Sequence, residues 1–177
     1  GETLPFSQED VRTQGWAIEA RLYAEDPYRN FLPSIGRLTR YSPPAEESSV
    51  RIDSGVIEGT EVGAHYDPLM AKLITHGKDR KAAIDAMRLA LHRFSVEGVS
   101  TNIPFLAHLF SHPRFVEGRL STQFLENEYP DGLKLAPLDR AIQTRVAALA
   151  AVLDYRTRDR VSRKVVGVRK RLIVRVN

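Results

Sequence analysis

The stretch Gly15–Pro33 constrains the fold of this chain more than any other. Its first half alternates two sets of side chains, namely Trp16, Ile18, Ala20 and Leu22 against Ala17, Glu19, Arg21 and Tyr23. Because strand side chains point alternately to opposite faces, this pattern predicts a strand with one apolar face against a core. The other face is either a solvated surface with an incidental ion pair or a polar site with partners. Asp26-Pro27 predicts the end of the strand, since proline cannot donate to a ladder.

The rest of the chain predicts an α+β domain, an antiparallel sheet with helices packed on one face. Residues 79–95 show the clearest helical period, with Asp79 placed to cap the first turn. Asp67-Pro68 fits a helix start as well as the beginning of a strand. Further strands are predicted at 37–41, 50–53, 56–58, 70–76, 96–99 and 165–176. Further helices are predicted at 103–110 (capped by Thr101 or Asn102 and ended by Pro113), 121–127 and 138–156.

Composition and charge narrow the class of protein. The chain has no cysteine, which excludes disulfides and thiolate chemistry. No window approaches 18 uninterrupted apolar residues, so we expect no membrane span. Residues 137–177 carry eleven Lys and Arg against three Asp, a net charge of +8 that leaves −4 for residues 1–136. This asymmetry predicts two structural units. The first residue is not Met, and we expect the chain to be an excised or processed fragment.

Several motifs, in order, carry a resemblance to a known family. They are Glu-Ala-Arg-Leu-Tyr-Ala-Glu-Asp-Pro (19–27), Phe-Leu-Pro-Ser-Ile-Gly (31–36), Val-Arg-Ile-Asp-Ser-Gly (50–55), Tyr-Asp-Pro-Leu-Met-Ala-Lys-Leu-Ile (66–74), Gly-Val-Ser-Thr-Asn (98–102), Phe-Leu (124–125) and Tyr-Pro-Asp-Gly (129–132). Together they resemble the C-terminal domain of biotin carboxylase, and within that group the biotin-carboxylating subunits of propionyl-CoA carboxylases. The resemblance covers about three quarters of the chain and favours a strand at 70–76.

The resemblance implies a biotin carboxylase C-terminal domain of the rudiment single-hybrid type at 15–132. It implies that 1–14 is the tail of the central ATP-grasp domain, and that 133–177 is a linker helix and the start of a bridging barrel domain. The implied reaction uses ATP with Mg²⁺ or Mn²⁺ to activate bicarbonate, and biotin then accepts the carboxyl group. The ATP lid and metal-binding residues belong to upstream domains, so we expect this fragment alone to be inactive.

The resemblance also implies roles for individual residues. Arg21 takes the place of the catalytic arginine that holds the ureido oxygen of biotin, where a guanidinium stabilises developing negative charge. Phe31 lies where an apolar residue contacts the biotin ring, although it could equally anchor its loop to the core. Asp67 is expected to support the site or to cap a turn. Thr122 falls in a segment near the adenine of ATP. Arg51 falls where biotin carboxylase monomers meet, although an ordinary exposed arginine is the simpler interpretation.

The implied partners are a carboxyltransferase (beta) subunit and a biotin carboxyl carrier domain in a hetero-oligomer, in the cytoplasm of a bacterium or in a mitochondrial matrix. Neither nucleic acid nor a membrane is expected as a partner. His108 and His112 have the i, i+4 spacing of metal ligands, but no carboxylate motif accompanies them, and no metal site is predicted. Two alternatives stay open: the biotin carboxylase part of an acetyl-CoA, methylcrotonyl-CoA or pyruvate carboxylase, or a non-catalytic interaction module.

Overall fold

The computed structural model describes residues 1–134 and 139–162. The chain divides into two compact units, Gly1–Lys134 and Leu135–Asn177, which are described separately. The strands are β1 (Trp16–Tyr23), β2 (Glu25–Asp26), β3 (Leu32–Pro33), β4 (Gly36–Arg37), β5 (Arg40–Ser42), β6 (Val50–Ser54), β7 (Glu61–Val62), β8 (Leu69–Gly77) and β9 (Ser95–Glu97). The helices are η1 (Gln8–Asp10), η2 (Pro27–Arg29), α1 (Arg80–Arg93), α2 (Ile103–Leu109), α3 (Pro113–Val116), α4 (Phe124–Glu128) and α5 (Arg140–Ser162).

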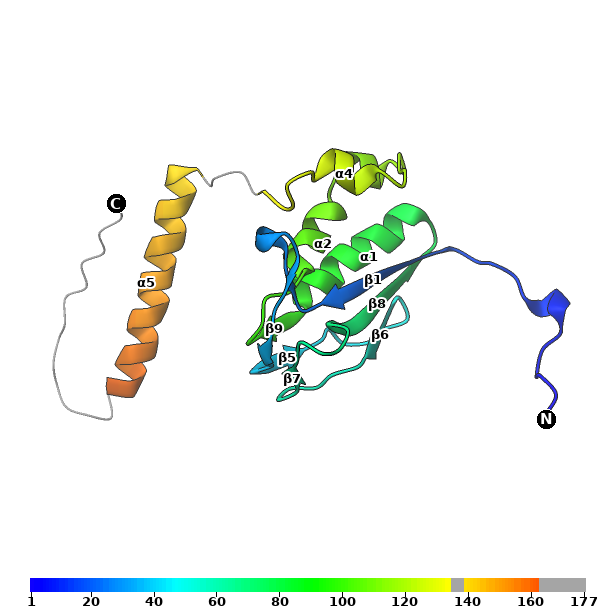
Figure 1. Cartoon of the computed structure of the whole chain (residues 1–177), viewed down its shortest axis with the longest axis horizontal. Coiled ribbons are helices and arrows are strands. Elements are labelled where there is room, and N and C mark those ends of the chain that lie inside the picture. Colours follow the sequence, from blue (N-terminus) through cyan, green and yellow to red (C-terminus); the bar gives the residue numbers. More distant parts are fainter. Residues whose placement is uncertain (135–138, 163–177) are drawn as a thin grey trace. The chain divides into compact units, whose positions relative to one another are not determined.

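An antiparallel three-stranded sheet in the order β1-β8-β6 forms the centre of the first unit (Figure 1). The register places Arg21 opposite Lys72 on β8, and Lys72 opposite Asp53 on β6. The β1 register shifts between Leu22 and Tyr23, so the end of this strand departs from the regular ladder. The predicted strands at 16–23, 50–53 and 70–76 are therefore confirmed.

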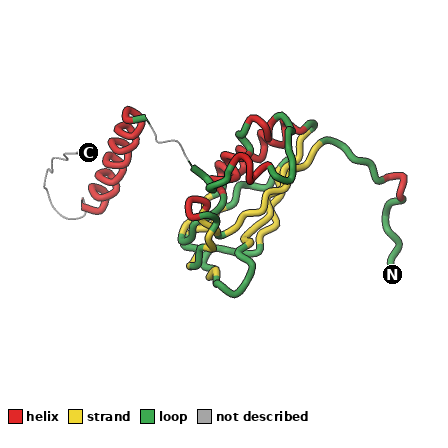
Figure 2. The backbone as a smooth tube through the Cα atoms, turned by 45° about the horizontal axis from the view of Figure 1, so that its top comes forward, coloured by secondary structure: helices red, strands yellow, loops and turns green. Residues whose placement is uncertain are grey.

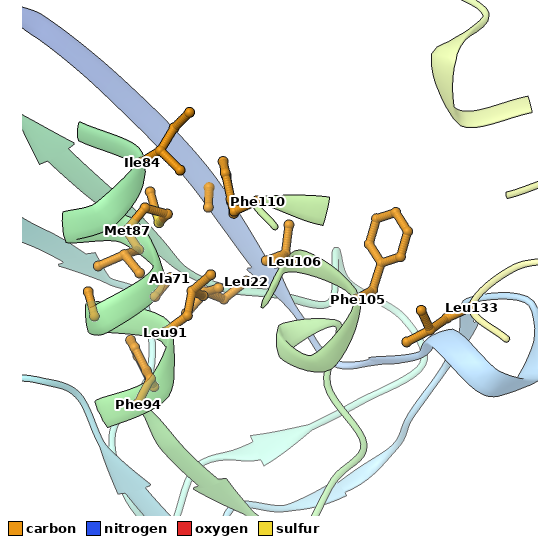
Figure 3. Packing of buried hydrophobic residues seen from close by; sticks show 13 residues of the cluster. Leu22, Ala71, Ile84, Met87, Leu91, Phe94, Phe105, Leu106, Phe110 and Leu133 are labelled. Carbon is orange, nitrogen blue, oxygen red and sulfur yellow. The ribbon is translucent and has the colours of Figure 1, made fainter. Parts of the chain in front are cut away.

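Helix α1 covers one face of this sheet, as the tube in Figure 2 shows. Asp79 caps the helix by accepting a hydrogen bond from the Ala82 N–H at 2.8 Å, which confirms the predicted start. The core between helix and sheet is labelled in Figure 3, where Leu22 and Ala71 of the strands face Met87 and Leu91 of α1. Alternation along β1 then directs the intervening side chains to the opposite face.

Short strand pairs complete the first unit. They are β2-β3, β4-β7 and β5-β9, all antiparallel. A second buried cluster lies among them, formed by Ala24, Leu38, Val62 and Met70. The predicted single strand at 37–41 is divided in two, because the fully buried Leu38 and its neighbour Thr39 separate segments that pair with different strands.

Three further local predictions are wrong. Residues 56–58 form no strand, because a turn at Gly59 (φ +90°) closes through a hydrogen bond from the Ile57 N–H to the Thr60 hydroxyl. Pro113 does not end α2 but begins α3, where its fixed φ suits the first helical position. Trp16 was expected on the core face but is 51% exposed, since the β1 residues that pack with the core begin at Ile18.

In the second unit, helix α5 confirms the predicted helix from Arg140 onward and continues to Ser162, while Leu138 lies outside the described residues. Its apolar side chains are exposed within this unit: Ile142, Val146, Leu149, Val152 and Leu153. The strand predicted at 165–176 lies outside the described residues. Among the residues that the structure describes, no helix combines the length and the apolar character needed to cross a membrane. The predicted domain boundaries stay predictions.

Candidate functional site

Arg21 lies on the face of the central sheet that α1 does not cover. Its neighbours in β1, Ala20 and Leu22, are buried against the core, so alternation turns the guanidinium to the open face. Its side chain is 57% exposed, and its Nε donates a hydrogen bond to the Glu19 carboxylate at 3.1 Å. Glu19 and then the Tyr23 phenol raise the pKa of the Arg21 guanidinium above its ordinary value. Arg21 is thus a permanent cation, oriented at one edge by Glu19.

A row of charged residues crosses this open face beside Arg21. Lys72 is the direct cross-strand partner of Arg21, and Asp53 is the next residue along the row. Directly opposite side chains in an antiparallel pair are neighbours. Lys72 also helps to lower the pKa of the Asp53 carboxyl, after the hydrogen bond from Arg51. The row therefore places a second cation next to Arg21, a relation set by the sheet register that neither the motifs nor the alternation of 70–76 could indicate.

Asn102 holds the main chain at Arg21 and Tyr23. Its amide oxygen accepts from the Tyr23 N–H at 2.9 Å, and its amide nitrogen donates to the Arg21 carbonyl at 3.0 Å. Its own main-chain N–H donates to the Tyr23 carbonyl at 3.1 Å. From the sequence, the one role expected of the Asn102 side chain was that of a helix cap. Although it occupies the N-cap position of α2, its side chain makes no capping hydrogen bond.

Phe31 lies in the loop directly before β3, where it lines an apolar pocket of about 490 Å³. The pocket is lined by Phe31, Phe105, Leu125, Glu126, Tyr129 and Pro130. The rings of Phe31 and Phe105 meet edge to face with centroids 4.9 Å apart. The backbone of Phe31 is left-handed, with φ of 57°, directly after Asn30 at 53°. This packing agrees with the core-anchor interpretation of Phe31, and its predicted contact with biotin stays a prediction.

Asp67 closes the turn that leads into β8. Its carboxylate accepts from the Leu69 N–H at 2.9 Å, a turn motif and not the start of a helix. Asp67 also acts on Glu25, whose pKa is raised first by burial and then by the charge of Asp67. Asp67 therefore shapes the entry to the strand that pairs with Arg21, and its supporting role at the site stays a prediction.

Of the other residues singled out in the sequence, Arg51 and the two histidines have partners of their own. Thr122 is exposed in the turn before α4. Arg51 is 71% exposed and donates twice to Asp53, each bond 2.9 Å long. His108 Nδ1 lies 2.9 Å from the Tyr129 hydroxyl. His112 Nε2 lies 3.1 Å from Glu128, so the two histidines turn to different partners.

Arg21 and Phe31 have different surroundings. Arg21 projects from the open face of the sheet, whereas the half-buried Phe31 packs against Phe105 of α2 and the main core cluster. Among the described residues, Glu19 accepts a hydrogen bond from the Nε–H of Arg21 and uses none of the terminal N–H groups of that guanidinium. Such a group can hold an anionic oxygen that approaches the open face.

Comparisons with known proteins agree with this architecture. Residues 19–127 match the biotin carboxylase C-terminal domain. The propionyl-CoA carboxylase alpha chain of Ruegeria pomeroyi is 49% identical over 86% of this chain and 25% of its own length. The mitochondrial methylcrotonoyl-CoA carboxylase subunit alpha of Mus musculus is 44% identical over 74% of this chain and 18% of its own length.

Solved structures show the same fold. The biotin carboxylase domain of Hydrogenobacter thermophilus 2-oxoglutarate carboxylase, in complex with MgADP, ADP and bicarbonate, superposes with a TM-score of 0.71 at 39% identity. The match covers 77% of this chain and 30% of that one. The chain therefore spans a quarter or less of the two carboxylase subunits and under a third of the solved domain. With more than half of its residues matched, the chain belongs to the biotin carboxylase C-terminal domain family.

Proposed function

We propose that this chain is the C-terminal part of an ATP-dependent biotin carboxylase subunit, in which Arg21 holds the ureido oxygen of biotin. The observation that carries the proposal is the position of Arg21, a permanent cation on the open face of a sheet whose other face is filled by the core. The proposed acyl-CoA carboxylase acts on propionyl-CoA, in keeping with the 49% identity to a propionyl-CoA carboxylase alpha chain.

The residues of this chain fit such a ligand. When bound, biotin supplies a ureido nitrogen that takes up the carboxyl group, and negative charge gathers on the ureido oxygen as that nitrogen loses its proton. The terminal N–H groups of Arg21 can donate to this oxygen while Glu19 retains the Nε–H. Because the guanidinium stays charged at any working pH, its stabilisation of that oxygen needs no proton transfer of its own.

Lys72 contributes to the same field. Its position directly opposite Arg21 adds positive potential to the open face, and Asp53 partly balances it. ATP, the metal ion and bicarbonate are proposed to bind residues of the longer subunit. The proposed partners are a carboxyltransferase subunit and a biotin carboxyl carrier domain, and the proposed compartment is the bacterial cytoplasm or the mitochondrial matrix.

The test is Arg21→Lys in the full-length subunit that carries this domain. A lysine keeps the charge but loses the fork of donors, so biotin carboxylation should fall by about 100-fold or more, with KM for ATP and for bicarbonate unchanged. Arg40→Lys is the matched control, because Arg40 is also 57% exposed and pairs loosely with Glu97 at 3.8 Å. Near-normal turnover by the Arg21→Lys subunit would refute the proposal.

A second candidate function is the biotin carboxylase of a different carboxylase. The 44% identity to a methylcrotonoyl-CoA carboxylase subunit favours it, because this domain would meet biotin and not the acyl group. Turnover of the assembled enzyme with propionyl-CoA, methylcrotonyl-CoA, acetyl-CoA and pyruvate in parallel distinguishes the two candidates.

A further inference from the structure

We propose that Asn102 is a positioning residue for Arg21, acting through the main chain of β1. The inference rests on the proposed role of Arg21. Asn102 and Arg21 are 81 positions apart in sequence, and Asn102 lies at the start of α2. Its side chain therefore connects a helix of the core to the strand that presents the guanidinium.

The geometry explains why β1 needs this connection. In the sheet order β1-β8-β6, β1 is an edge strand. Alternate residues of an antiparallel strand direct their N–H and C=O groups away from the partner strand. At Arg21 and Tyr23 these outward groups meet Asn102, which supplies an acceptor and two donors over 2.9 to 3.1 Å. Asn102 thus takes the place of a missing neighbouring strand.

The position of Asn102 along β1 is equally informative. The regular pairing with β8 shifts between Leu22 and Tyr23, one residue after Arg21. Beyond that shift, the ladder alone no longer sets the direction of the main chain. Because the amide spans Arg21 and Tyr23, it fixes the main chain on both sides of the shift. The direction of the Arg21 side chain is set by that main chain.

The amide group of Asn102 is chemically suited to this task. Its two partners are one donor and one acceptor, so a side chain with only acceptors cannot satisfy both. Asn102 is only 7% exposed, and water is therefore a poor substitute for it. Asparagine at an N-cap ordinarily accepts from its own helix, but this side chain makes no such bond and is committed to β1.

A double-mutant cycle in the full-length subunit tests the inference. Asn102→Ala should lower the single-turnover rate of biotin carboxylation by roughly 10-fold to 100-fold, the size expected for a misplaced reacting group, with KM for ATP unchanged. In an Arg21→Gln subunit, the same Asn102→Ala change should lower the residual rate by less than about twofold, because there is no guanidinium left to misplace. A merely structural role would give the same loss in both backgrounds.

Two further variants complete the experiment. Asn102→Asp keeps the acceptor for the Tyr23 N–H but loses the donor to the Arg21 carbonyl. It replaces the alanine variant if that variant does not fold, and its loss of rate should likewise depend on the presence of Arg21. Thr75→Val is the control, since it removes another buried hydrogen bond, 2.9 Å to the Ala83 carbonyl, on the core side of the sheet. Its turnover should be unchanged.

The outcomes separate the two proposals. Equal losses from Asn102→Ala with and without Arg21 would overturn the positioning role and leave the role of Arg21 intact. An Arg21→Gln subunit with normal turnover would instead overturn the proposed function. A loss at Asn102 that disappears in the Arg21→Gln background supports both.

Discussion

At Phe31 the glycine variant should be more stable than the alanine variant, whereas alanine is ordinarily the more stable of the two. Phe31 has a left-handed backbone with φ of 57°, which costs a residue with a side chain about 1–2 kcal/mol. Two contacts hold it there. Its N–H donates to the Asp26 carbonyl at 2.8 Å, and its ring packs against Phe105 with centroids 4.9 Å apart. The packing of the ring therefore opposes the strain of the backbone.

The magnitudes follow from these two terms. Phe31→Ala removes a partly buried ring, and the loss of about 100 Å² of buried apolar area costs about 2.5 kcal/mol while the strain remains. Phe31→Gly loses the same ring but relieves about 1–2 kcal/mol of strain, against about 0.4–1 kcal/mol of extra freedom in the unfolded chain. The glycine variant should thus be about 0.5–1 kcal/mol more stable than the alanine variant.

Urea unfolding of the 177-residue chain measures this difference directly. The control is Phe115, whose ring meets Phe110 edge to face at 5.0 Å but whose backbone lies in the helix α3. At that position glycine should be about 0.5–1 kcal/mol less stable than alanine. If Phe31→Ala proves as stable as Phe31→Gly, the left-handed backbone at Phe31 is wrong.

Two more predictions concern the frame that carries the site. Gly98→Ala should destabilise the chain by more than about 3 kcal/mol, because at φ +103° a Cβ would lie 2.0 Å from the Arg37 carbonyl oxygen. Gly63 has open space around it, so Gly63→Ala is the control and should change stability by less than about 0.5 kcal/mol. Thermal melts of the two variants measure both effects. The raised pKa of Glu25 means that the folded state holds its proton at higher pH than the unfolded state, so this group lowers stability as pH rises above 4.5. Glu25→Gln should remove that pH dependence and stabilise the chain at neutral pH by about 0.5 kcal/mol. The measurement is the urea midpoint of each protein between about pH 4 and pH 7. A Glu25→Gln midpoint that changes with pH as steeply as that of the wild type would contradict this prediction.

Local sequence patterns predicted the elements that bury a single face against the core. The alternation of β1 and the helical period of α1 both depend on burial of a single face, and both were found close to the predicted bounds. Short segments that pair with distant strands carry no such period. Residues 37–41 looked like one strand, yet their parts pair with β7 and β9, and only the long-range pairing determines this.

The candidate site shows the same division. Arg21 was found from a motif and its alternation with Ala20 and Leu22. Lys72 and Asn102 were missed because their relation to Arg21 depends on sheet register and on a contact across 81 positions. No periodicity in a single sequence reports either relation.

The alternation of β1 between a buried and an open face bears on how the domain works. A ligand held by Arg21 would lie on the open face of the sheet, where the alternation of β1 places the guanidinium. The buried face then gives the strand its stability, and the open face is free to carry charge. Asn102 belongs to the buried side but reaches the edge of β1, where it links the packing of α2 to the direction of Arg21. On this argument, a change in the packing of α2 lowers the rate of carboxylation only as far as it moves the Arg21 main chain.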